Sequence, residues 1–226
     1  MSKILIAISL LVAAAVNAPA ALLVQYDFTN GSDSPSTTGS NVVTYDMTST
    51  DSDFGFSSSG DNLFVRADNT TSSASDAATD GKRFELRLDA ATGYQLNLTE
   101  LKFDTYWQQQ SNMIGTAEPQ WIIDSNLGGF DPENPDVGTH SIVSANSNSP
   151  DAASFTLGAQ FQGLSAVTFR IYAIDQVSGT NAGIFRADDL TIEGVSAVPE
   201  PTSASILILG VFALAMLHRS RRVANA

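Results

Sequence analysis

Apolar and polar residues alternate in short runs along residues 21–198, which is the pattern of half-buried β-strands. The clearest run is Arg83 to Asp89, in which Phe84, Leu86 and Leu88 share one face and charged residues take the other. The remaining predicted strands cover residues 22–28, 42–47, 63–67, 94–98, 101–107, 121–124, 141–144, 155–157, 167–174 and 184–193. Turn-forming residues separate these runs, and no helical period is sustained among them. The pattern therefore predicts an all-β fold, a single antiparallel β-sandwich of the jelly-roll type.

The first twenty residues follow a different pattern. Lys3 precedes a largely apolar run of 13 residues from Ile4 to Val16, and the small residues Ala18, Pro19 and Ala20 follow. A short positive region, an apolar region and a small-residue site are the three parts of a secretory signal peptide. We predict a signal peptide at residues 1–20 that signal peptidase removes after Ala20.

The end of the chain holds a second apolar segment. Ile206 to Leu217 contains no charged residue, and residues 202–218 would span about 26 Å as a helix, close to the ~30 Å of a hydrocarbon core. Three arginines follow directly and would keep the C-terminus in the cytoplasm. We predict a transmembrane helix at 202–218 that leaves the preceding residues outside. The alternative is a buried core helix.

The order of motifs at this end resembles the PEP-CTERM sorting signal of Gram-negative bacteria that produce exopolysaccharide. The residues that carry the resemblance are Pro199, Glu200 and Pro201 before the apolar segment and Arg219, Arg221 and Arg222 after it. The resemblance implies an exosortase-type processing peptidase as a partner, which cuts near Pro-Glu-Pro. It also implies export through the inner membrane, a transient membrane anchor, and delivery to the cell surface or extracellular matrix. The chain then divides into a signal peptide at 1–20, a β-sandwich domain at 21–197 and a sorting signal at 198–226.

Charge narrows the classes of ligand. Residues 21–198 contain 23 Asp and Glu against 7 Lys and Arg, a net charge of about −16. Such a surface repels phosphate backbones, so we expect no nucleic-acid partner. It suits solubility or divalent cations. The chain has no cysteine, which excludes disulfides and thiol catalysis, so stability must come from the hydrophobic core, with bound metal as a further contribution.

Few residues of the predicted domain could act in catalysis. His140 is the single histidine of the exported part, and neither a G-x-S-x-G elbow nor an HExxH motif occurs. Paired carboxylates of the glycosidase type remain open because acids are abundant, yet no pair stands out. We therefore predict no catalytic residue and a non-enzymatic protein, with a carbohydrate-active enzyme as the alternative.

One acidic residue falls on the face predicted to point inward. Asp188 has the same strand parity as Arg186, Leu190 and Ile192. A carboxylate on that face needs compensation: an ion pair with Arg186, a bulge near Ala187 that turns it outward, or a structural calcium held together with an acid from another strand such as Asp27. We expect no required cofactor, and structural calcium is only one of these three alternatives.

Aromatic residues suggest where a sugar would bind. Tyr106, Trp107 and Trp121 form the best cluster of ring faces with polar neighbours. Tyr106 has outward parity, Trp107 shares the apolar register, for which core packing is the alternative, and Trp121 opens a strand and fits either role. The segments from Phe169 to Asp175 and from Gly183 to Gly194 resemble the closing strand pair of carbohydrate-binding-type jelly rolls carried by many such exported proteins.

Taken together, these features predict an exported surface or matrix protein, a non-catalytic binding or structural β-sandwich associated with exopolysaccharide. A second alternative is an envelope protein whose C-terminal helix is never removed and which stays anchored in the membrane.

Overall fold

The structure is a computed structural model that describes residues 19–50, 54–57, 62–66, 82–108, 120–142, 150–174 and 184–198, together with residues 73, 76 and 79. At positions 54, 65, 66, 107 and 108 it describes the backbone alone. Nearly all of the predicted signal peptide and sorting signal, including the apolar segment at 202–218, lies outside the described residues. Among the residues that are described, no helix is long and apolar enough to cross a membrane.

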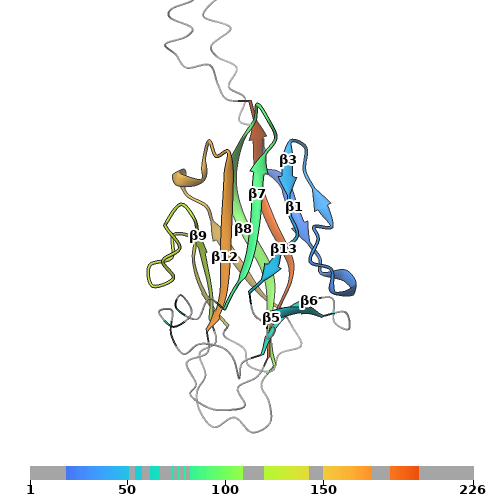
Figure 1. Ribbon diagram of the computed structural model, residues 1–226, viewed down its shortest axis with the longest axis vertical. Helices are drawn as coiled ribbons and strands as arrows, with labels where there is room; N and C mark the ends of the chain where they lie inside the picture. The colour runs from blue at the N-terminus through green and yellow to red at the C-terminus, as the bar shows by residue number, and fades with distance from the viewer. Residues whose placement is uncertain are drawn as a thin grey trace, which may run out of the picture.

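The described chain folds into two antiparallel sheets packed face to face, which Figure 1 shows with one sheet in front of the other. Sheet A has the order β11 (Asp151–Thr156), β8 (Gln95–Gln108), β13 (Ile184–Ala197), β1 (Ala21–Tyr26) and β2 (Thr37–Thr38); β6 (Asn62–Arg66) also pairs with β13, and β5 (Phe54–Ser57) with β6. Sheet B has the order β10 (Gly138–Ser141), β9 (Gln120–Ser125), β12 (Ala166–Ile174), β7 (Phe84–Ala90) and β3 (Val42–Thr44), and β4 (Thr48–Ser49) pairs with β7. From β7 onward the chain crosses repeatedly between the sheets. The predicted all-β, jelly-roll-like sandwich is confirmed.

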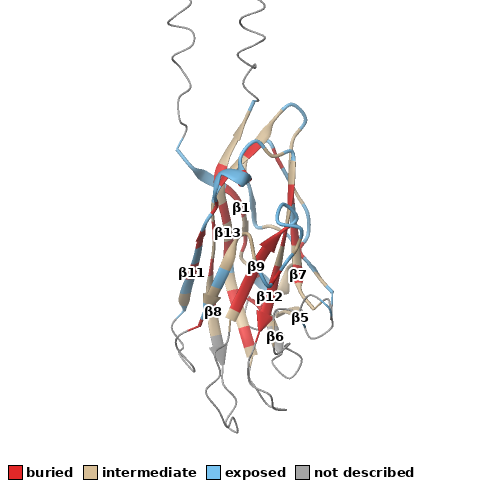
Figure 2. Cartoon of the chain, turned by 90° about the vertical axis from the view of Figure 1, so that its left-hand side faces the viewer, coloured by how far each residue is buried: buried red, intermediate tan, exposed pale blue. Residues whose placement is uncertain are grey.

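The core fills the space between the sheets because the alternating apolar residues of both sheets point inward. Figure 2 shows the sandwich edge on, with buried positions in red along β9 and β12. Trp121 of β9 lies between Phe103 and Phe185 of sheet A, edge to face, with ring centroids 5.8 and 5.5 Å away. Aromatic packing of this kind joins the two sheets directly.

Several strands differ in extent from the predicted ones. Residues 95–98 and 101–107 belong to one 14-residue strand, β8, which continues through a register shift in its pairing with β13 between Leu98 and Glu100. The first strand ends at Tyr26, since Phe28 adopts a left-handed conformation (φ 49°) and begins a short 3₁₀ turn. Strand β5 was not predicted, and it forms by pairing with β6.

The two ends of the domain lie together. Ala21 at the start of β1 pairs with Gly194 of β13, and Gln95 at the start of β8 pairs with Ala197. Any segment that follows residue 198 therefore leaves from the end of the sandwich at which β1 begins.

Candidate ligand-binding face

A bulge in β13 decides which side chains of this strand reach the surface. Phe185 and Ala187 are buried, and so are Leu190 and Ile192, although the two pairs have opposite parity. The parity changes at Asp189, which has a φ of 48° and lies in the register shift between Asp188 and Thr191. The expectation that Asp188 shares the inward face of Leu190 is therefore wrong. The bulge alternative is confirmed, two residues beyond Ala187, and it places Arg186 and Asp188 on the outer face of sheet A.

Two aromatic residues flank Arg186 on that outer face. Arg186 pairs with Tyr106 of β8 on one side and with Phe64 of β6 on the other. Side chains directly opposite on antiparallel strands lie about 5 Å apart at Cβ, so the three form one row across three strands. The Phe64 ring lies over Gly55 of β5: a Cβ at that glycine would come within 3.0 Å of Phe64 Cζ. We call Tyr106, Arg186 and Phe64 the aromatic row.

Carboxylates lie beside the aromatic row. Asp188 pairs with Asp104 of β8 in the neighbouring position along the strands. Burial raises the pKa of Tyr106, and the charges of Asp104, Asp188 and Asp189 raise it further. Asp189 also accepts a hydrogen bond from Gln25 Nε2 (3.2 Å), which ties the bulge to β1.

A shallow depression continues this face away from the aromatic row. It has a volume of about 260 Å³ and is lined by residues 102–104 of β8, residues 152–154 of β11, and Asp189 and Thr191 of β13. Lys102 forms ion pairs with Glu193 and Glu100 at its edge, and Ser154 Oγ donates to Glu100 Oε1 (2.6 Å). The face thus presents small side chains, hydroxyls and charged groups within reach of two aromatic rings.

The structure separates the three aromatic residues predicted to form a sugar site. Tyr106 is half-buried on the outer face, as its parity predicts. Trp121 is fully buried, and its Nε1 donates to Thr105 Oγ1 in the core. The prediction that Trp121 contacts a ligand is therefore wrong, because this side chain has no exposed surface. The side chain of Trp107 lies outside the described residues.

The predicted calcium ligands are not brought together by any contact that the structure describes. Asp27 Oδ1 accepts a hydrogen bond from the Thr29 backbone N–H (3.1 Å) and closes the turn after β1. Within the described part of the chain, no three His, Asp or Glu side chains are grouped closely enough to hold a metal ion. Calcium at Asp27 and Asp188 stays a prediction.

The single histidine of residues 21–198, His140, joins the two sheets. His140 Nε2 lies 3.1 Å from Asp151 Oδ2, between the edge strand β10 of sheet B and the edge strand β11 of sheet A. Both side chains are half-buried, so this pair links the edges of the sandwich on the side where β11 borders the depression.

No family model matches this chain, and no curated protein matches its sequence. Among solved structures it is similar to a carbohydrate-binding module described for specific mannan recognition, with 12% identity over 79% of this chain and 99% of that one and a TM-score of 0.39. It is also similar to the K1 cleaved adhesin domain of Lys-gingipain from Porphyromonas gingivalis W83, with 13% identity over 77% of this chain and 98% of that one and a TM-score of 0.35. A third similar structure holds the CBM22-1–GH10 modules of xylanase 10B from Clostridium thermocellum complexed with xylohexaose. The identity is 15% over 81% of this chain and 30% of that one, with a TM-score of 0.34. Such loose similarities carry no argument about a ligand, and the fold described above rests on the strands of the chain itself.

Proposed function

We propose that this protein is an exported, non-catalytic β-sandwich that binds a polysaccharide through the aromatic row on the outer face of sheet A. The observation that carries the proposal is the pairing of Arg186 with Tyr106 and Phe64, next to Asp104 and Asp188. Aromatic rings pack against the apolar C–H face of a pyranose, while carboxylates accept hydrogen bonds from its hydroxyls and a guanidinium donates to its oxygens. The aromatic row and the two carboxylates beside it offer all three kinds of contact at successive positions on one face of the sheet.

The shape of this face supports binding over catalysis. Its depression is open and small, whereas sites that enclose a small molecule commonly measure about 300–1,000 Å³. A glycosidase needs two carboxylates on opposite sides of the scissile bond. Asp104 and Asp188 instead lie side by side on adjacent strands of one sheet, which suits hydroxyl recognition along a chain that lies across the strands.

The position of the aromatic row suits a protein held at its C-terminal end. Tyr106 lies eleven residues along β8 from Gln95, which pairs with Ala197 near the end of the domain, a separation of about 35 Å at 3.3 Å per residue. If the PEP-CTERM-like segment anchors or sorts the chain as its motifs predict, the aromatic row faces away from the membrane. This geometry favours capture of extracellular polysaccharide.

The test is a polysaccharide array and affinity electrophoresis with the purified full chain and the variants Tyr106→Ala and Phe64→Ala. Loss of a ring that stacks on a sugar should weaken binding by about tenfold, since 1.4 kcal/mol is a tenfold change in Kd and aromatic contacts contribute on this order. Tyr45→Ala is the matched control, because this exposed tyrosine belongs to the sheet B side, where its hydroxyl donates to Asp89 (2.8 Å). Equal binding by all the variants, or no binding by the wild type, would refute the proposal.

A further inference from the structure

The outer face of sheet A is acidic around the aromatic row. Among the side chains described on this face of β8 and β13, five are carboxylates and two are cationic: Glu100, Asp104, Asp188, Asp189 and Glu193 against Lys102 and Arg186. This part of the face therefore has a net charge of −3, in a domain whose charge is about −16. A surface with this field repels anions before any contact forms, and the repulsion is strongest at low ionic strength.

One of the two cations is already neutralised. Lys102 forms ion pairs with Glu193 and with Glu100, the second with 3.5 Å between Nζ and Oε2. It lies at the edge of the depression, two residues before Asp104 on β8. An anionic ligand at this position would have to approach both glutamates as well as the ammonium group. Lys102 therefore presents no excess positive charge to a polysaccharide.

The other cation has two carboxylates in the neighbouring position along the strands. Arg186 lies opposite Tyr106 of β8, and the next pair with the same orientation is Asp188 and Asp104. Positions diagonal to one another on adjacent strands are about 7–8 Å apart, which is within reach of a long side chain. Asp188 Oδ1 also accepts a hydrogen bond from the Asp189 N–H (2.8 Å), which holds its carboxylate beside the bulge. The positive charge of Arg186 is therefore outweighed at the aromatic row itself.

The carboxylates also limit which polar groups a ligand can present. When ionised, Asp104 and Asp188 accept hydrogen bonds and donate none. A sugar hydroxyl can donate to them, so a neutral sugar satisfies its own hydroxyl and the aspartate together. A carboxylate or sulfate group on an acidic sugar is itself only an acceptor, so it forms no such bond and repels the aspartates. Hydrogen bonding and charge thus favour the same class of ligand.

We propose that the aromatic row selects neutral polysaccharides over those that carry carboxylate or sulfate groups, and that Asp104 and Asp188 determine this specificity. The inference rests on the proposed function and narrows its ligand class. Specificity of this kind comes from a penalty on the wrong ligand as much as from contacts with the right one. A single negative charge on a bound sugar, about 7 Å from one carboxylate in water, weakens binding roughly threefold. The two carboxylates together should therefore weaken it about tenfold at low ionic strength.

The experiment takes the polysaccharides that the array retains, with galactomannan, xylan and hydroxyethylcellulose as the first probes, and compares each with its own carboxymethyl derivative. Affinity electrophoresis of the full chain in EDTA and low salt gives the two Kd values. The wild type should bind the derivative at least about tenfold more weakly, and high salt should reduce this difference. In Asp104→Asn/Asp188→Asn the ratio of the two Kd values should fall about tenfold, because asparagine keeps an acceptor oxygen and loses the charge.

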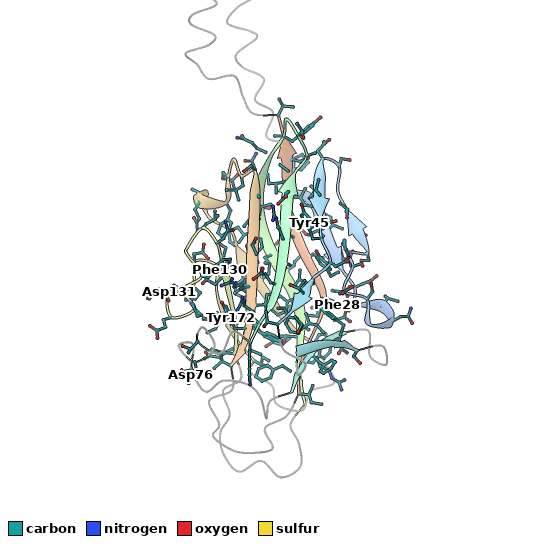
Figure 3. All side chains as sticks on the ribbon, in the orientation of Figure 1. Phe28, Tyr45, Asp76, Phe130, Asp131 and Tyr172 are labelled. Atoms are coloured by element: carbon teal, nitrogen blue, oxygen red, sulfur yellow. The ribbon has the colours of Figure 1, made fainter. Side chains whose placement is uncertain are left out.

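The matched control is Asp131→Asn/Glu133→Gln, which changes the net charge of the domain by the same amount. Both residues are exposed on the loop between β9 and β10, and Figure 3 shows Asp131 on this loop beside β9 of sheet B. The control should keep the wild-type ratio of Kd values. A control that shifts the ratio as much as Asp104→Asn/Asp188→Asn does would overturn the inference, because the charge of the whole domain would then exclude the anionic chain.

Other results would also overturn the inference and still leave the proposed binding of a polysaccharide standing. These are equal binding of both forms by the wild type, retention of anionic polysaccharides alone on the array, and binding of the derivative once CaCl₂ replaces EDTA. In the last case a bridging cation would make the acidic face a receptor for anionic chains. If the array retains nothing, the proposed function is refuted and this inference with it.

Discussion

Replacing Trp121 by Phe tests whether this residue acts in the core or at the proposed binding face. Trp121 lies between Phe103 and Phe185, and its Nε1 donates to Thr105 Oγ1, which in turn donates to the backbone oxygen of Arg186 (3.2 Å). Phenylalanine keeps most of the ring contact but deletes the indole N–H. It leaves a smaller side chain in a site without exposed surface, and it removes the donor to Thr105.

The expected loss is about 2–3 kcal/mol, the sum of a partly unsatisfied buried hydroxyl and a small residual cavity. For a domain of this size each kcal/mol lowers the Tm by roughly 2–4 °C, so thermal unfolding followed by circular dichroism should shift down by about 4–12 °C. Adding Thr105→Val to Trp121→Phe should cost less than the sum of the two single changes, because the pair removes both partners of one hydrogen bond.

Binding provides the contrast. At a temperature where both variants are folded, Trp121→Phe should keep the wild-type affinity for the polysaccharide, whereas Tyr106→Ala should lose affinity with little change in Tm. An unchanged Tm for Trp121→Phe, or weaker binding by the folded variant, would show that the indole does not have the core role that its burial assigns to it.

Two further substitutions and one mass measurement test other parts of the molecule. Gly194→Ala would place a Cβ 2.3 Å from the backbone oxygen of Asn97, so the backbones of β8 and β13 must move apart. We expect the free energy of unfolding, measured with urea, to fall by at least about 3 kcal/mol. A variant as stable as the wild type would contradict this expectation. The hydrogen bond from Arg87 is the main cause that lowers the pKa of Asp89. A carboxyl group with a lowered pKa stabilises the fold above its unfolded-state pKa, and this stability is lost as the pH falls below about 4. On acidification Asp89→Asn should therefore lose about 0.5–1 kcal/mol less stability than the wild type. The PEP-CTERM-like tail predicts that protein recovered from the cell surface lacks residues 202–218, which intact mass spectrometry measures; a mass that includes them would favour permanent anchoring.

The sequence was enough to predict most of the strands but not which strands pair with one another. Alternation located nine of the strands and the sandwich, because burial on one face imposes period two wherever a strand is regular. The strand predicted at 141–144 was misplaced, since β10 covers Gly138–Ser141. It failed at Asp189, where one left-handed residue reverses the parity of β13 and turns Asp188 outward. The contact of Phe64 with Arg186 depends on β6 pairing beside β13, a long-range event that no local pattern encodes.

The role of Trp121 also could not be decided from the sequence. An aromatic residue at the start of a strand has the composition of a sugar site and of a core alike, and the sequence left both roles open. What decides is the polar atom of the ring: a buried indole needs an acceptor, and Thr105, a threonine with inward parity on β8, provides it. The sequence did contain one relevant signal, a threonine at a predicted core position. Burying its hydroxyl costs free energy unless the hydroxyl has a hydrogen-bond partner.

The β13 bulge explains how one strand serves two purposes. Before the bulge, β13 sends Phe185 and Ala187 into the core and presents Arg186 and Asp188 to the surface; after it, Leu190 and Ile192 return to the core. A regular strand with the same sequence would either bury Asp188 together with Leu190 and Ile192, or bury Asp189 together with Phe185 and expose Leu190 and Ile192. Both alternatives cost more than one residue at positive φ, which for aspartate is about 1 kcal/mol. The unusual backbone of Asp189 is therefore the feature that lets the aromatic row and the core coexist on β13, and a single inserted or deleted residue at this point would exchange one for the other.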